Sequence, residues 1–134
     1  MSALLIIESL NPQATSLPGD LVPFVQSSWN RGDKRRRGVH DTSGHMLALS
    51  DAEVDATNQQ ITDAVAFLSR HADLCSRYIE TLISPRAELV LAACIFPARA
   101  AAQEITLPTE LVAAAGRLAL SVSIRTYLTD ESAA

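Results

Sequence analysis

Glycine, cysteine and long apolar runs are all scarce in this chain of 134 residues. Its five glycines lie far apart, so they do not build the glycine-rich loop that cradles phosphates in nucleotide-binding proteins. No Gly-x-Ser-x-Gly segment marks a nucleophilic serine, and neither cysteine has a histidine partner in a recognisable motif. We therefore predict no catalytic residue and no cofactor from the sequence.

Signals for membranes and secretion are absent as well. No apolar run reaches the roughly 18 residues that span a bilayer. The first residues carry no cationic leader, and Glu8 interrupts their apolar run, so we expect a strand there and not a signal peptide. Cys75 and Cys94 lie in apolar surroundings without Cys-x-x-Cys spacing, which predicts two buried thiols. These features together predict a cytoplasmic protein without a membrane partner.

The charge of the chain is divided unevenly. Five of its eleven basic residues fall within residues 31–37, the basic loop, which with Asp33 has a net charge of +4. The rest of the chain holds six basic and fourteen acidic residues, a net charge of −8, which gives −4 overall. The only tryptophan, Trp29, comes just before this loop. The cationic residues of the basic loop are Arg31, Lys34, Arg35, Arg36 and Arg37.

Five apolar segments predict the strands of one sheet. Segment 24–30 is expected to pair antiparallel with 45–49, with the basic loop at the tip of the pair. Segment 88–96 is too apolar for an exposed position, so we place it in the centre of the sheet. Leu89, Leu91, Ala93, Ile95, Val122 and Ile124 are expected to be buried in that central part. The predicted strands are residues 3–9, 24–30, 45–49, 88–96 and 120–125.

A long helical segment is predicted over residues 51–84. Ser50 and Glu53 have the spacing of a capping box, which indicates a helix start. The segment is either one helix or two in tandem, with a break near His71. Apolar residues recur every three or four positions and predict a buried face, whereas His71 falls outside this face and needs no function. The buried face comprises Ile61, Val65, Leu68, Ala72, Cys75, Ile79 and Leu82.

Two shorter helices complete the expected order. Asn11 and Pro12 are typical of a helix N-terminus, and residues 107–110 open a last helix. The order strand, helix, strand, strand, helix, strand, helix, strand predicts an α+β fold, a mostly antiparallel sheet with helices packed on one face. Residues 1–134 form a single domain, of which 128–134 is a frayed tail. The predicted buried face of the last helix is Leu111, Val112, Ala115, Leu118 and Ala119.

Several short motifs recur in the order of a known family. They are Asn11-Pro12, Pro23, Trp29, Arg31-Gly32-Asp33, the helical segment 52–83, residues 107–118 and Tyr127. Together they resemble the bacterial family catalogued as domain of unknown function 4279. The chain differs from the pattern in the third strand, where His45-Met46 replaces the usual aromatic residue. The resemblance implies the fold over nearly the whole chain and no particular activity.

The basic loop is the predicted binding site. Guanidinium groups bind carboxylates or phosphates through paired hydrogen bonds, and Trp29 can stack on a base or a cation. Most nucleic-acid binders are basic overall, so an acidic protein, including a second copy of this acidic chain, is the more expected partner. We interpret the chain as a non-catalytic protein-interaction module of immunity or regulatory type. The alternative is a ligand-binding protein or enzyme with a closed pocket near Trp29, Arg31 and Asp33.

Asp33 and two histidines have other possible roles. Because Asp33 follows a glycine, its carboxylate is expected to accept backbone N–H bonds in the turn or to pair with a nearby arginine. His40 and His45 flank a predicted turn and, with Asp41, form a possible zinc site. No third firm ligand has a usable spacing, so we predict exposed loop histidines and no bound metal.

Overall fold

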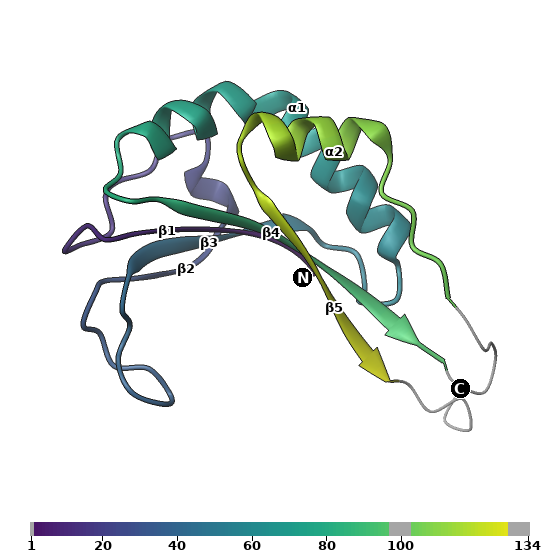
Figure 1. Ribbon diagram of the computed structural model, residues 1–134, viewed down its shortest axis with the longest axis horizontal. Helices are drawn as coiled ribbons and strands as arrows, with labels where there is room; N and C mark the ends of the chain where they lie inside the picture. Colours follow the sequence, from purple (N-terminus) through teal and green to yellow (C-terminus); the bar gives the residue numbers. More distant parts are fainter. Residues whose placement is uncertain (1, 97–102, 129–134) are drawn as a thin grey trace.

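The computed structural model describes residues 2–96 and 103–128. They form one five-stranded sheet with two α-helices packed against it, which confirms the predicted α+β class (Figure 1). The strand order is β2-β3-β1-β4-β5, and every neighbouring pair is antiparallel except β4 and β5. The strands are β1 Ala3–Ser9, β2 Val25–Trp29, β3 Ser43–Ser50, β4 Arg86–Ile95 and β5 Ser121–Leu128.

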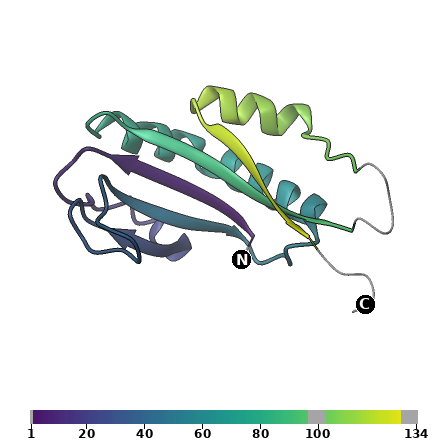
Figure 2. The same cartoon turned by 60° about the horizontal axis from the view of Figure 1, so that its bottom comes forward.

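Both helices cover the same face of the sheet. Helix α1 (Thr57–Glu80) follows β3 and α2 (Thr109–Arg117) connects β4 to β5, and the two views show them on one side (Figures 1 and 2). The alternation of side chains along β1 reflects this arrangement, since Leu5 is fully buried whereas Leu4 and Ile6 are half-buried. Within the described residues, no helix is long and apolar enough to cross a membrane.

A row of apolar side chains crosses the sheet beneath the helices. Leu5 of β1 lies opposite Leu47 of β3 on one side and opposite Leu89 of β4 on the other. Val122 of β5 continues the row, because it lies beside Leu89 in the parallel pair. Same-face neighbours at this spacing pack directly against one another and hold the strands in register. The helices complete the core with Ile61, Ala64, Phe67, Leu68, Cys75 and Leu111.

The helix predicted from Asn11 does not form. Asn11 uses its side chain elsewhere, because its Oδ1 accepts the backbone N–H of Ile83 at 2.8 Å and is not available as a helix cap. The carbonyl of Thr15 accepts a hydrogen bond from the Tyr78 hydroxyl, which holds this segment extended against α1. The helical turn between β1 and β2 is a single 3-10 turn, η1 (Val22–Phe24).

The capping-box prediction at Ser50 is also wrong. Helix α1 begins at Thr57, and the Ser50 hydroxyl donates to Asp63 Oδ2 at 2.6 Å while it accepts the N–H of Ala52. The helix then runs without a break through His71, which is 9% exposed. The buried face of α1 is therefore wider than the predicted apolar face, because it also includes Phe67 and His71, which contact Phe24 of η1.

The last helix and last strand are more exposed than predicted. Val112 is 55% exposed and Ala119 is exposed, so α2 packs on the sheet mainly through Leu111 and Ala115, with Leu118 just after its end. Strand β5 is an edge strand, and its Val122 and Ile124 are only partly buried, because one side of β5 has no neighbouring strand. Strand β5 extends to Leu128, while the rest of the predicted tail, 129–134, lies outside the described residues.

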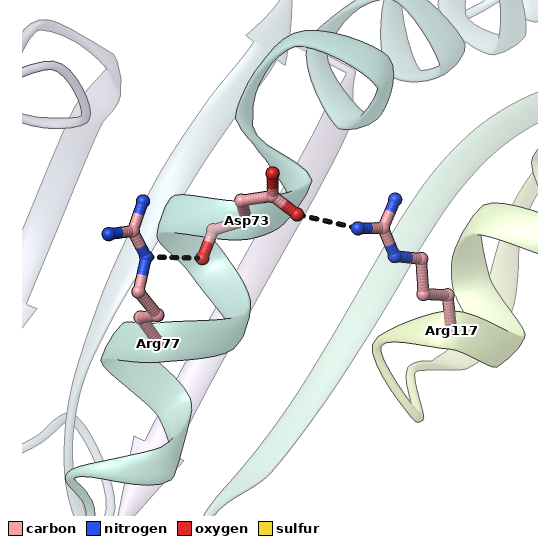
Figure 3. A network of polar contacts seen from close by, with 3 residues as sticks. All are labelled: Asp73, Arg77 and Arg117. Carbon is pink, nitrogen blue, oxygen red and sulfur yellow. Dashed lines mark hydrogen bonds and ion pairs between the residues drawn. The ribbon is translucent and has the colours of Figure 1, made fainter.

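A surface ion pair joins the two helices. Arg117 of α2 donates to Asp73 of α1, and Arg77 Nε donates to the backbone oxygen of Asp73 at 3.4 Å (Figure 3). The side chains of Arg117 and Asp73 are 64% and 75% exposed. A pair with this exposure contributes about 0–1 kcal/mol to stability. The apolar contacts beneath the helices therefore determine how α1 and α2 pack.

Leu91, which is fully buried on the helix-covered face of β4, provides a test of this core. Leu91→Ala should lower the free energy of unfolding by about 2–5 kcal/mol, because it removes buried methyl groups and leaves a cavity. The control Val112→Ala should change it by less than about 0.5 kcal/mol, since Val112 is exposed. Urea denaturation followed by Trp29 fluorescence measures both, and similar losses in the two variants would contradict the described core.

Candidate functional site

The backbone of the basic loop is ordered by its own hydrogen bonds. The N–H of Gly32 donates to the oxygen of His40 at 2.9 Å, and the N–H of His40 donates to the oxygen of Asp33 at 2.9 Å. Lys34 and Val39 then form an antiparallel bridge. The loop is therefore a small hairpin that extends from the β2–β3 pair, and we call residues 30–40 the basic hairpin.

The tip of the basic hairpin carries the densest charge. The N–H of Arg35 donates to the oxygen of Gly38 at 3.1 Å, which closes a four-residue turn with Arg36 and Arg37 at its centre. Gly38 has φ of +83°, a left-handed conformation in which a side chain is strained. The sequence order Arg-Arg-Arg-Gly therefore suits a tight turn that projects its charges outward.

Asp33 stabilises the first turn of the basic hairpin. Its Oδ2 accepts the backbone N–H of Asn30 at 2.8 Å, while its own N–H donates to the oxygen of Asn30 at 3.0 Å. Gly32 lies between them with φ of +90°, again a conformation that favours glycine. This confirms the prediction that the carboxylate of Asp33 accepts a backbone N–H in the turn.

Arg31 attaches the hairpin to the body of the molecule. Its N–H donates to Ser43 Oγ at 2.7 Å, and that hydroxyl donates in turn to the oxygen of Asn11 at 2.7 Å. The Arg31 guanidinium reaches the oxygen of Leu10 at 3.4 Å. Sequence analysis missed the role of Ser43, because a serine in a turn shows no preference for a partner far away in the chain.

Trp29 packs beneath the hairpin. A Cβ atom added to Gly44 would meet Trp29 Cζ2 at 2.8 Å and the backbone oxygen of Ile7 at 2.5 Å, so the indole lies directly over this glycine. The ring also stacks on His40, with centroids 5.3 Å apart and planes at 21°. Trp29 Nε1 is buried and has no hydrogen-bond partner among the described residues. Trp29 thus supports the fold of the hairpin, and its ring faces are already in contact with protein.

The other cationic side chains of the loop are free. All residues from 31 to 39 are exposed. Across residues 2–96 and 103–128, no side-chain hydrogen bond or ion pair is made by Lys34, Arg35, Arg36 or Arg37. The hairpin therefore combines a fixed backbone with four uncompensated positive charges. Charges arranged in this way can pair with carboxylates or phosphates on another molecule.

The two histidines do not form the paired site that their spacing allowed. His45 is 8% exposed, which corrects the prediction of an exposed loop residue. Its Nε2 donates to the oxygen of Thr15 at 2.8 Å, and its Nδ1 is 2.6 Å from Ser28 Oγ. His40 instead stacks on Trp29. Among the described residues no three histidine, cysteine or carboxylate side chains are grouped to hold a metal ion.

The two cysteines are separate buried thiols. Cys75 of α1 and Cys94 of β4 are both free and buried, as the sequence predicts. Burial raises the pKa of the Cys75 thiol to about 11. A thiol with that pKa stays protonated at neutral pH, whereas a nucleophilic cysteine reacts as the thiolate. Cys75 is therefore a small apolar core residue.

The clefts of the molecule lie away from the predicted binding residues. The clefts on the described part of the chain include five with volumes between 250 and 520 Å³. Trp29, Arg31 and Asp33 line none of them. The basic hairpin is thus an exposed projection outside these five clefts, a shape suited to contact with a large partner.

Comparison with known proteins yields no match to a family model, a curated protein or a solved structure. The resemblance to the family catalogued as domain of unknown function 4279 therefore stays a prediction. Function has to be inferred from the geometry and charge of the basic hairpin.

Gly44 tests how the hairpin is attached. Gly44→Ala should lower the free energy of unfolding by about 1–3 kcal/mol, because the new Cβ meets a backbone oxygen and the Trp29 ring. Gly116→Ala is the matched control, since a Cβ there meets no atom within 4 Å. It should raise the free energy of unfolding by about 0.5–1 kcal/mol, because alanine favours the helix more than glycine does. Urea denaturation measures both, and a stable Gly44→Ala variant with unchanged Trp29 emission would refute the close packing.

Proposed function

We propose that this protein is a non-catalytic interaction module that binds an acidic face of a partner protein through its basic hairpin. The observation that carries the proposal is the set of four exposed and uncompensated cations on an ordered backbone. We further propose that the module is an immunity-type or regulatory protein. Binding rather than catalysis is favoured because the charged groups project from the surface and do not converge in a cleft.

The ordered backbone supports specific binding. A flexible loop loses conformational entropy when it binds, at about 1–2 kcal/mol for each residue whose backbone becomes fixed. In the basic hairpin much of that ordering is already present before a partner arrives, because the turns at Asp33 and Gly38 are hydrogen-bonded. The arginines then offer planar groups that pair with carboxylates through two hydrogen bonds.

The charge distribution favours a protein partner over nucleic acid. Residues 31–37 have a net charge of +4, and the rest of the chain has a net charge of −8. That acidic body repels an extended polyanion along its whole length, whereas a local acidic patch on a protein meets mainly the hairpin. Screening over about 8 Å at physiological salt weakens the repulsion from more distant charges. The stacked position of Trp29 also removes the aromatic platform on which bases bind.

A ligand site or active site near Trp29, Arg31 and Asp33 has less support. The carboxylate of Asp33 is engaged with the Asn30 N–H, and the Arg31 backbone and guanidinium are bound to Ser43 and Leu10. These contacts leave few polar groups there for a small molecule. The geometry therefore favours protein binding through the basic hairpin over a small-molecule site.

Lys34 allows a direct test, because it is the only lysine of the chain. A water-soluble carbodiimide joins its amine to a carboxylate of a bound partner, so cross-links obtained in the native lysate should map to Lys34 and to acidic residues. Lys34→Arg is the matched control, since it keeps the positive charge but removes the reactive amine. It should abolish the cross-link and preserve capture of the partner. Partner peptides cross-linked only to other sites would contradict the proposal.

The three arginines at the tip provide the quantitative prediction. Replacing Arg35, Arg36 and Arg37 by serine should leave the melting temperature nearly unchanged, because exposed charges contribute little to folding. The association rate constant with the partner identified by cross-linking should fall by about tenfold or more, since opposite charges accelerate encounter. The control variant has serine in place of three exposed arginines outside the hairpin, Arg77, Arg86 and Arg125. It loses the same amount of charge but should retain fast association, because the hairpin is intact.

Gel-shift titration tests the competing class of partner. Generic single-stranded RNA and duplex DNA should show no shift at about micromolar protein near physiological salt, because the acidic body opposes polyanion binding. Binding that disappears in the Arg35, Arg36 and Arg37 variant would replace the acidic protein with nucleic acid. If nucleic-acid binding fell equally in this variant and in the control variant at Arg77, Arg86 and Arg125, the cause would be net charge and not the hairpin.

A further inference from the structure

A small cleft lies between α1, η1 and β3, outside the basic hairpin. Its volume is about 250 Å³, and both apolar and charged side chains line it. A neighbouring cleft of about 520 Å³ shares Phe24 and Leu49, which provides space beyond the first cleft. The side chains that line the first cleft include Phe24, Leu49, Asp63, Phe67, Arg70 and His71.

Three aromatic rings form one wall of the cleft. The rings of Phe24 and Phe67 meet edge to face with centroids 4.9 Å apart. The imidazole of His71 contacts both, at 5.5 Å from Phe24 and 4.9 Å from Phe67. A cavity of about 150 Å³ lined by apolar side chains is large enough to bind benzene. The cleft therefore has room for one ring with a short substituent against this aromatic wall.

His71 is a buried polar group without a protein partner. Its side chain is 9% exposed, and its Nδ1 is buried without a hydrogen bond among the described residues. A proton on Nδ1 would leave a buried N–H without an acceptor, which is unfavourable. The proton of the neutral ring therefore belongs on Nε2. That N–H is the one the ring can offer to an acceptor in the cleft.

Arg70 provides a free positive charge beside His71. It is exposed and has no side-chain hydrogen bond or ion pair within residues 2–96 and 103–128. Asp63 also lines the cleft but lies seven residues earlier in α1, about 10 Å along the helix axis. Its two oxygens already accept hydrogen bonds from Ser50 and Gln59. The end of the cleft at Arg70 and His71 is thus suited to an anion.

We infer that this cleft binds a small apolar carboxylate, such as an aromatic acid. Its ring packs against Phe24 and Phe67, and its carboxylate accepts hydrogen bonds from the Arg70 guanidinium and from His71 Nε2. An apolar body matches the aromatic wall, and the carboxylate pairs with two side chains that make no hydrogen bond within residues 2–96 and 103–128. This site is separate from the basic hairpin and does not depend on the function proposed for it.

Benzoate and phenylacetate are the probes for this inference. Titration of ¹⁵N-labelled protein should shift the amide signals of Phe67 and His71, with a dissociation constant of about 1 mM or tighter. The ¹⁵N signals of the His71 ring should report a proton on Nε2 and should move on addition of benzoate. Benzyl alcohol and benzylamine, which carry the same ring without the carboxylate, should bind more weakly.

Arg70→Gln tests the charge at the rim without disturbing the aromatic wall. It should weaken benzoate binding by about tenfold and leave benzyl alcohol unaffected, because one ionic contact is lost. Arg77→Gln, an exposed arginine on the same helix, is the matched control and should bind benzoate normally. Absence of shifts at Phe67 and His71, equal weakening in both variants, or a preference for benzylamine would each overturn the inference.

Discussion

The register of β1 between β3 and β4 is the constraint on which the rest of the molecule depends. Leu5 faces Leu47 and Leu89 on the same side of the sheet, and the helices pack over that row. Side chains alternate along a strand, so a slip of one residue would move the row of apolar side chains to the open face. The same register pairs Gly44 with Glu8, close to the backbone oxygen of Ile7, and thereby fixes where β3 meets the basic hairpin.

The rigidity of the basic hairpin follows from that anchoring. Trp29 lies over Gly44, His40 stacks on Trp29, and Arg31 is bound to Ser43 at the start of β3. The like charges at the tip repel one another and oppose the tight turn. The backbone hydrogen bonds of residues 30–40 hold the turn closed against this repulsion. The molecule thereby holds a compact group of cations at a defined place on an acidic body. In the function that we propose, this arrangement favours rapid encounter with acidic surfaces and disfavours polyanions.

The two proposed sites differ in the physics of recognition. The basic hairpin is exposed, so water and salt weaken each of its ionic contacts, and binding there depends on several charges together. The cleft beside α1 is small and partly apolar, so one carboxylate between Arg70 and His71 interacts in a less polar environment. Salt should therefore affect association at the hairpin more strongly than binding in the cleft.

Sequence alone determined the features that depend on neighbouring residues. Apolar segments predicted the strands, charge counting located the basic loop, and the order Gly32-Asp33 predicted the turn in which Asp33 accepts a backbone N–H. Only the tertiary structure decided the roles of Asn11, Ser50 and His71. Each of these residues has a satisfactory local role in the sequence, as a helix start, a cap or a surface residue. Packing changed those roles, because a distant partner or a buried environment outweighs a local preference of about 1 kcal/mol.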